Sequence, residues 1–159
     1  MNYTFNEVSC LVADNEIISF TKGSPGLVTF DFFAAWNKWK QKPFKSLKMI
    51  HVHPASYPNM SSIDANMLPG WAKAFPIEID FTIFCRVFSP KLENDNFFEK
   101  KYLAQYKDND YILHEENLKI RDSSDFISEV DIQLIKMSNN LDLFDEINNK
   151  YLGKNYLTL

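Results

Sequence analysis

Hydrophobic residues in the first third of the chain follow first a strand-like and then a helix-like spacing. Two β-rich stretches, residues 7–12 and 16–20, flank a turn-forming ADNE segment and predict a β-hairpin. Further on, Phe32 opens an aromatic pattern of helical period that continues to residue 39. Asp31 is a suitable N-cap for this helix, and Pro43 is expected to end it.

The middle of the chain predicts a strand, a helix and a second strand. Residues 46–53 have the composition of a strand, and Pro54 is expected to end its pairing. One of the serines at 61–62 caps the predicted helix, and the LPG triplet at 68–70 is expected to kink or split it. Residues 77–88 are apolar on both faces, which predicts a strand at the centre of a sheet.

The last part of the chain changes from strand to helix periodicity. Residues 100–116 contain two strand-like runs around KDND and predict a second hairpin. Apolar residues within 127–137 and 141–151 have helical spacing and predict two amphipathic helices. The fold class is therefore α/β or α+β, a mixed sheet flanked by helices. We expect a domain over residues 1–120 and a C-terminal helical extension over 121–159 that packs on it.

Composition narrows the classes of function. A chain of 159 residues fits one domain, and a net charge of −4 without a basic run makes nucleic acid a poor partner. The chain lacks an apolar run of bilayer-spanning length and a secretory leader, so we expect a cytoplasmic protein without membrane contact. Two cysteines, Cys10 and Cys85, lie in strand-like stretches and are expected to be reduced core thiols.

The candidate chemistry lies between residues 51 and 64. His51 and His53 are two of only three histidines, and on a strand both imidazoles point to one face. Asp64, in the first turn of the next helix, offers a carboxylate as a third ligand. Two neutral imidazoles and one carboxylate leave Zn²⁺ an open position for water, as catalytic zinc sites require. Ser61 lies one helical turn before Asp64, a suitable position for an oxyanion donor.

Each of these residues also has an ordinary structural explanation. A histidine on an apolar strand is usually a core or surface residue, and Ser-x-x-Asp is a common helix cap. Their joint spacing, His-x-His followed by Ser-x-x-Asp, favours a metal site over four separate coincidences. His114, in the predicted second hairpin, has no such companions and is expected to be an ordinary histidine.

The stretch HVHPASYPNMSSID resembles the signature of the JAMM (MPN+) zinc metallopeptidases, which is His-x-His-Pro, six residues, then Ser-x-x-Asp. The order of predicted elements over residues 1–120 is similar as well. That family has a glutamate at the start of an early strand, a second strand, a helix, the His-x-His strand, the helix with the aspartate, a central strand and a hairpin. The resemblance implies a JAMM/MPN-like, cytidine-deaminase-like core.

The resemblance also implies roles for individual residues. His51, His53 and Asp64 would bind one Zn²⁺ per chain, and Ser61 would stabilise the tetrahedral intermediate. The general base would be an upstream glutamate. Glu7 opens the first predicted strand, as the family topology requires, and is preferred to Glu16, which opens the second.

The leading hypothesis is therefore a zinc-dependent peptidase or isopeptidase with a protein or peptide substrate. By the same resemblance, one candidate substrate is the C-terminal tail of a ubiquitin-like protein, bound along a sheet edge. Two alternatives stay open. In the first, the chain is a non-catalytic MPN-like scaffold whose C-terminal helices dock a partner protein. In the second, the same metal-binding residues hydrolyse an amide other than a peptide bond.

Overall fold

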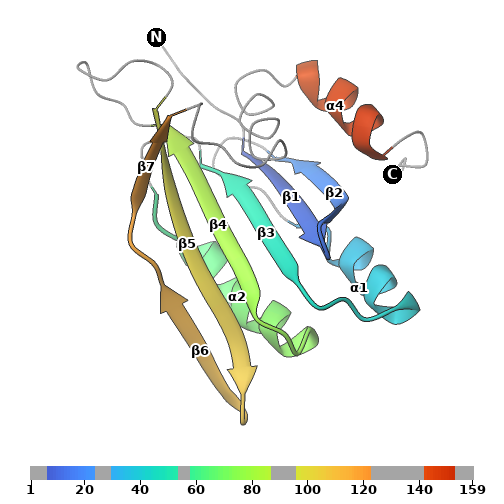
Figure 1. Cartoon of the computed structure of the whole chain (residues 1–159), viewed down its shortest axis with the longest axis vertical. Coiled ribbons are helices and arrows are strands. Elements are labelled where there is room, and N and C mark those ends of the chain that lie inside the picture. The colour runs from blue at the N-terminus through green and yellow to red at the C-terminus, as the bar shows by residue number, and fades with distance from the viewer. Residues whose placement is uncertain (1–6, 24–29, 54–57, 87–95, 123–141, 153–159) are drawn as a thin grey trace.

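The computed structural model describes residues 7–23, 30–53, 58–86, 96–122 and 142–152 (Figure 1). Within these ranges the fold is mixed α/β, with a seven-stranded sheet and helices on both of its faces. The elements are β1 (Val8–Ala13), β2 (Glu16–Lys22), α1 (Phe32–Gln41), β3 (Leu47–Val52), α2 (Ser62–Ala74), β4 (Ile79–Arg86), β5 (Asn96–Lys107), β6 (Asp110–Glu115), β7 (Lys119–Asp122) and α4 (Asp142–Leu152).

Strand order in the sheet is β2-β1-β3-β4-β5-β6, and β7 pairs with the beginning of β5. Only β3 and β4 are parallel, and α2 provides the crossover between them. All other pairs are antiparallel. The strand predicted to be central, β4, is indeed enclosed between β3 and β5, and its side chains from Ile79 to Cys85 are largely buried.

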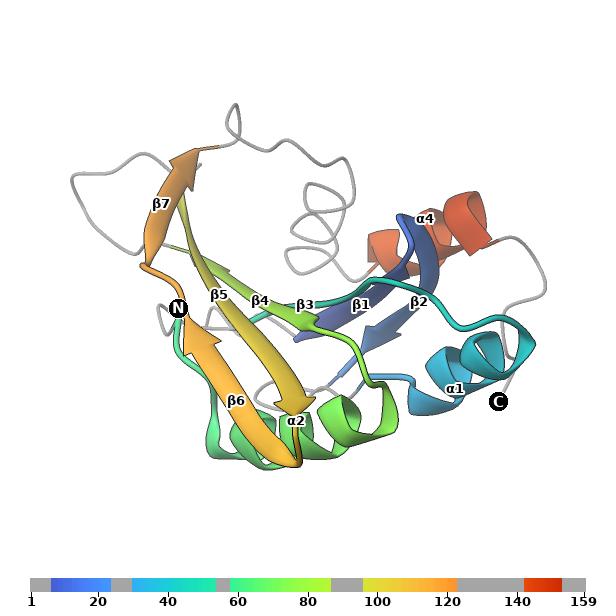
Figure 2. The ribbon, with the colours of Figure 1, turned by 60° about the horizontal axis from the view of Figure 1, so that its bottom comes forward.

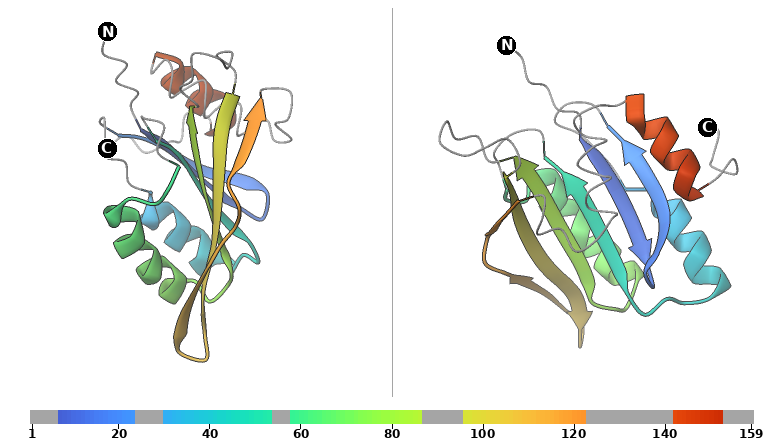
Figure 3. Two further views of the ribbon diagram at one scale, coloured as in Figure 1. Left: turned by 90° about the vertical axis from the view of Figure 1, so that its left-hand side faces the viewer. Right: turned by 45° about the horizontal axis from the view of Figure 1, so that its top comes forward.

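The alternation of side chains along β1, β3 and β4 divides the core in two. Odd-numbered residues such as Leu11, Met49 and Phe81 pack with α1 and α2. Even-numbered residues such as Cys10 and Ile50 pack with α4 on the opposite face. Figure 2 shows α4 on one side of the sheet and α1 and α2 on the other, and the edge-on view in Figure 3 shows α1 and α2 side by side on one face of the sheet. The parity of a residue in these strands thus decides which layer it enters.

The first hairpin turns at Asp14 and Asn15, whose φ angles are 49° and 64°. Two consecutive left-handed residues make a type I′ turn, which suits the twist of paired strands. The Asp14 carboxylate accepts hydrogen bonds from the backbone N–H groups of Lys45 (2.9 Å) and Ser46 (3.0 Å), and its own N–H donates to the Ser46 carbonyl at 3.1 Å. The turn is therefore tied to the segment that leads into β3.

Helix α1 begins as the sequence predicts, because the Asp31 carboxylate accepts a hydrogen bond from the Ala34 N–H at 3.0 Å. It ends at Gln41, before Pro43. Its aromatic residues Phe32 and Trp39 both contact the ring of Phe75 at the end of α2, with centroids 5.6 and 5.5 Å apart. Aromatic packing thus joins the two helices that lie on the face of the sheet with the odd-numbered residues.

Helix α2 begins after Ser61, one of the two predicted caps, and of the predicted kink or split at the LPG triplet the split does not occur. The helix continues through Pro69 and Gly70 to Ala74. Pro69 removes its own N–H from the helical ladder, and its ring crowds the carbonyl of Ala65 one turn earlier. Leu68, Trp71 and Ala72 are buried in the core on either side of it, and this packing outweighs the local loss.

The end of the described chain differs from the predictions in one element. β7, a strand of four residues paired with β5, has no counterpart in the sequence analysis. The predicted helix within 127–137 lies outside the described residues. α4 corresponds to the second predicted helix, and its Phe144 and Ile147 pack against the sheet. Among the described helices, none combines the length and apolar character needed to cross a membrane.

Candidate metal centre

The His-x-His pair lies at the end of β3, on the face that α2 covers. His51 and His53 are 1% and 6% exposed, and their Nε2 atoms are 2.6 Å apart. Their rings stack with centroids 4.5 Å apart. The strand predicted from the sequence therefore does bring the two imidazoles together, as its two-residue period requires.

Asp64 completes the group from the first turn of α2. Its Oδ2 atom lies 3.4 Å from the Nε2 of His51 and 3.3 Å from the Nε2 of His53. The same Oδ2 accepts a hydrogen bond from the Ser61 backbone N–H at 3.1 Å, while the Ser61 hydroxyl accepts one from the Asp64 N–H at 3.1 Å. This reciprocal capping box fixes both the start of the helix and the direction of the carboxylate. One donor atom from each of the three residues lies within 4.8 Å of the others, so the group could hold a metal ion.

Two of the three distances between the donor atoms suit a small tetrahedral cation. Two ligands bound at the usual zinc distances of 2.0–2.1 Å lie about 3.3 Å apart. Both distances from the Asp64 Oδ2 meet this value. The two histidine nitrogens, at 2.6 Å, are closer and share a proton as a hydrogen-bonded pair. A bound cation would replace that proton.

The buried Nδ1 atom of His51 makes no hydrogen bond in the structure. A neutral imidazole that donates from Nε2 leaves Nδ1 as an unsatisfied acceptor, which is costly when it is buried. When Nε2 instead binds a metal, Nδ1 carries the proton and needs an acceptor. Nδ1 of His51 thus lacks a partner among the described residues in either state, so it does not distinguish the metal-free from the metal-bound form.

Electrostatics favour the protonation states that bind a metal. Burial lowers the pKa of His51 to about 3, despite the opposing carboxylate of Asp64, and the charge of His53 acts in the same direction as burial. For Asp64, burial raises the pKa, but the hydrogen bond from His53, the charges of both histidines and the Ser61 N–H outweigh it and lower the pKa overall. Neutral imidazoles and an ionised carboxylate are the forms that coordinate cations.

Aromatic rings exclude water from one side of the group. The rings of Phe30 and Phe81 have centroids 5.6 and 5.1 Å from that of His51, and Phe30 in turn contacts Phe81 and Trp71. Such apolar walls strengthen electrostatic interactions within the site. The sequence analysis did not identify Phe30 as part of this region, because it precedes β3 by a whole helix.

Glu7, the preferred general base, lies beside the histidines. Ser9 of β1 pairs with His51 of β3, and Val8 pairs with Val52. One further step in this register sets Glu7 opposite His53, on the same face. Glu7 is 8% exposed, and its carbonyl accepts a hydrogen bond from the Gly23 N–H at 2.8 Å, which continues the β1–β2 pairing. Ser9, buried opposite His51 and two positions after Glu7, was not identified from the sequence, although the spacing Glu-x-Ser on one strand matches His-x-His on the next.

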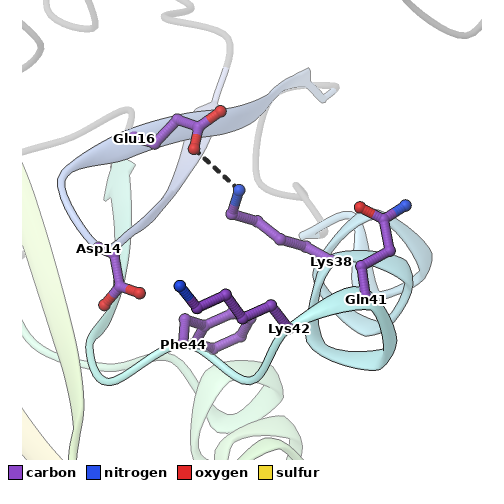
Figure 4. A pocket seen from close by; sticks show the side chains of 6 residues that line it. All are labelled: Asp14, Glu16, Lys38, Gln41, Lys42 and Phe44. Carbon is purple, nitrogen blue, oxygen red and sulfur yellow. Dashed lines mark hydrogen bonds and ion pairs between the residues drawn. The ribbon is translucent and has the colours of Figure 1, made fainter.

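Glu16, the other candidate base, lies at the opposite end of β1. It pairs with Ala13, is exposed, and its carboxylate forms an ion pair with Lys38 at 2.8 Å. Figure 4 shows this pair on the wall of a pocket of about 230 Å³ between the first hairpin and α1. Ala13 lies five positions after Val8 along β1, and this distance is roughly 17 Å along a strand. His114 is exposed on β6 and takes no part in the group.

The described residues thus contain a buried group of two histidines and one aspartate, with a serine and a glutamate close by. Cys10 and Cys85 are buried and form no disulfide, and Cys10 packs on the opposite face of the sheet. No protein-family model matches the chain, and a search of curated proteins finds no match.

Proposed function

We propose that the protein is a zinc-dependent hydrolase that cleaves peptide or isopeptide bonds. The observation that supports this most strongly is the buried His51–His53–Asp64 group, in which three donor atoms converge at distances suited to one cation. Two imidazoles and a carboxylate suit zinc, and three protein ligands leave a position for water or substrate. The JAMM/MPN-like core inferred from the signature is part of the same proposal.

Zinc held by these three residues would supply a nucleophilic hydroxide at neutral pH and would polarise the substrate carbonyl. The Glu7 carboxylate, on the same face as His53, is the group proposed to accept the proton of the attacking water and return it to the leaving amine. Glu7 is only 8% exposed, and this burial limits the access of bulk water to that proton.

Ser61 is proposed to stabilise the developing oxyanion. Its hydroxyl accepts a hydrogen bond from the Asp64 N–H, which holds the side chain in place. A hydroxyl that accepts through a lone pair still has its proton to donate. The capping box thus orients the donor as well as the ligand, so that neither has to reorganise during the reaction.

The substrate proposed is a protein or peptide, with the tail of a ubiquitin-like protein as one candidate by analogy with the JAMM family. Hydrolysis of another amide uses the same groups and stays an alternative. α4 is proposed to belong to a C-terminal helical extension that offers a surface to a partner protein, and the site of action is proposed to be the cytoplasm.

One observation favours a second candidate function. His51 and His53 already form a hydrogen bond at 2.6 Å, and Asp64 lies within 3.4 Å of both nitrogens. A closed polar network of this kind can also act as a structural element of a non-catalytic scaffold. If the protein is such a scaffold, it binds no zinc and has no hydrolytic activity, and the loss of one imidazole impairs its folding.

The test begins with elemental analysis of the purified protein, which should contain about one zinc per chain. His53→Ala should lose the metal, whereas the exposed His114→Ala should keep it. Hydrolysis of a panel of ubiquitin-like fusions, isopeptides and short peptides should then require zinc and stop with a chelator. Zinc retained in full by His53→Ala contradicts the ligand assignment. A protein that binds no zinc and cleaves no member of the panel supports the scaffold.

A further inference from the structure

Lys100 is a buried cation on the same face of the sheet as the candidate metal centre. It is 8% exposed, and no other lysine or arginine among the described side chains is buried. In the register of the sheet, His51 pairs with Ile83 of β4, and Ile83 pairs with Lys100 of β5. Residues directly opposite one another share a face, so Lys100 lies in one row with His51, two strands away.

A second set of contacts connects Lys100 with the start of α2. Its Nζ lies 5.8 Å from the centre of the Tyr102 ring. The Tyr102 hydroxyl accepts a hydrogen bond from the Met60 N–H at 3.3 Å, and Met60 immediately precedes Ser61. A chain of contacts through Tyr102 and Met60 therefore connects Lys100 with the start of α2.

The partner of Lys100 comes from the edge strand β6. Its Nζ forms an ion pair with the Oε1 of Glu115 at 2.7 Å, and the Glu115 side chain is 56% exposed whereas that of Lys100 is 10% exposed. Burying an ammonium is costly unless a carboxylate compensates for it. An exposed glutamate on an edge strand can leave this position at little cost, because water solvates it readily.

We propose that Lys100 forms a carboxylate-binding subsite next to the metal centre, with Glu115 as the internal group that a substrate carboxylate displaces. The inference rests on the proposed function. Two strand spacings separate Lys100 from His51 by about 10 Å, which is the length of about three extended residues. The substrate class is then a peptide that carries an acidic side chain, or a free C-terminal carboxylate, about three residues from the hydrolysed bond.

The neighbouring Lys101 offers a matched control. It follows Lys100 on β5, so its side chain points to the opposite face, and it forms an ion pair with Asp80 at 3.3 Å. Lys101→Met removes the same charge from the same strand and breaks a comparable ion pair. It leaves the row of the histidines unchanged.

Binding is measured by NMR titration of the full chain with three tripeptides: acetyl-Gly-Gly-Glu-amide, acetyl-Gly-Gly-Gln-amide and acetyl-Gly-Gly-Gln with a free carboxylate. The wild type should bind at least one of the two acidic peptides about tenfold more tightly than the neutral Gln amide. Comparison of the Glu amide with the free-carboxylate Gln peptide shows whether the subsite prefers an acidic side chain or a C-terminal carboxylate. Lys100→Met should abolish the preference, and Glu115→Gln should strengthen acidic binding because the competitor is gone. Lys101→Met should have no effect.

A purely structural ion pair predicts a different pattern, in which Lys100→Met and Glu115→Gln both lower stability and neither alters selectivity. Equal binding of all three peptides by the wild type, or no binding, overturns the inference. So does weaker acidic binding by Glu115→Gln. Lys100→Gln replaces Lys100→Met if the latter does not fold. These titrations are run with a chelator present, so they measure peptide binding without hydrolysis. Failure of the zinc-loaded protein to hydrolyse any peptide therefore counts against the proposed function but not against the carboxylate-binding subsite.

Discussion

Asp64 has two roles that a pair of substitutions can separate. It caps α2 through the Ser61 N–H, and it faces both imidazoles with its Oδ2. Asp64→Asn keeps the size of the side chain and an oxygen that can accept from Ser61, but it removes the negative charge. Asp64→Ala removes both. We therefore expect Asn to affect mainly metal binding, and Ala to affect both the metal and the helix.

The magnitudes follow from these contacts. Loss of the capping interaction costs about 1 kcal/mol, so metal-free Asp64→Ala should be less stable than metal-free Asp64→Asn by about that amount. For the wild type, zinc at 100 times its Kd adds about 2.7 kcal/mol, which raises Tm by roughly 5–11 °C for a chain of this size. If Asn weakens affinity about 100-fold, the same zinc concentration adds only about 0.4 kcal/mol, or roughly 1–2 °C.

The assay is thermal unfolding of each protein with a chelator and at a series of zinc concentrations. The dependence of Tm on zinc gives the apparent affinity, and the chelator series gives the stability of the metal-free form. A Tm of Asp64→Asn that rises with zinc as steeply as that of the wild type refutes the assignment of Asp64 as a ligand. A wild-type Tm that does not respond to zinc refutes the metal centre itself.

Three further predictions concern other parts of the molecule. Glu7→Gln should lower kcat by about 10²–10⁴-fold and keep zinc bound, whereas Glu16→Gln should remain active; the reverse result identifies Glu16 as the base. Asp14 has a pKa lowered from 3.8, chiefly by the hydrogen bond from the Lys45 backbone N–H. The wild type should therefore be more stable than Asp14→Asn above pH 3.8, the ordinary pKa of the group, and should lose this advantage as the pH falls through the lowered pKa of the folded state. Urea unfolding of both proteins at a series of pH values measures the difference. Pro69→Ala should raise the free energy of unfolding by about 2 kcal/mol. The helix gains about 3 kcal/mol when the proline is removed, and the greater freedom of the unfolded chain takes back about 1 kcal/mol. An unchanged midpoint of urea unfolding contradicts this prediction.

The elements that depend on local chemistry could be predicted from the sequence. Asp31 and Ser61 cap their helices through bonds to residues three positions away, and the first hairpin turns within the predicted ADNE segment. The convergence of His51 and His53 also follows from the period of a single strand. Each of these features depends on only a few consecutive residues, so a single sequence is enough to predict it.

Features that depend on pairing between distant segments could not be predicted in this way. β7 has four residues and two of its side chains, Lys119 and Ile120, are exposed, so its own pattern is too short to indicate a strand. It forms because β5 extends beyond the end of β6. The continuity of α2 through Pro69 likewise depends on packing against the sheet, which local propensity does not include.

The position of Glu7 is the clearest case of a site residue fixed from a distance. β1 and β3 are not consecutive in the chain, and only their register sets Glu7 beside His53. A slip of one residue would turn Glu7 and Ser9 to the face that α4 covers. Apolar residues such as Leu11 resist this slip, and so do the bonds that Asp14 makes with the segment before β3. A turn at one end of β1 thus helps to determine which carboxylate lies next to the histidines at the other end.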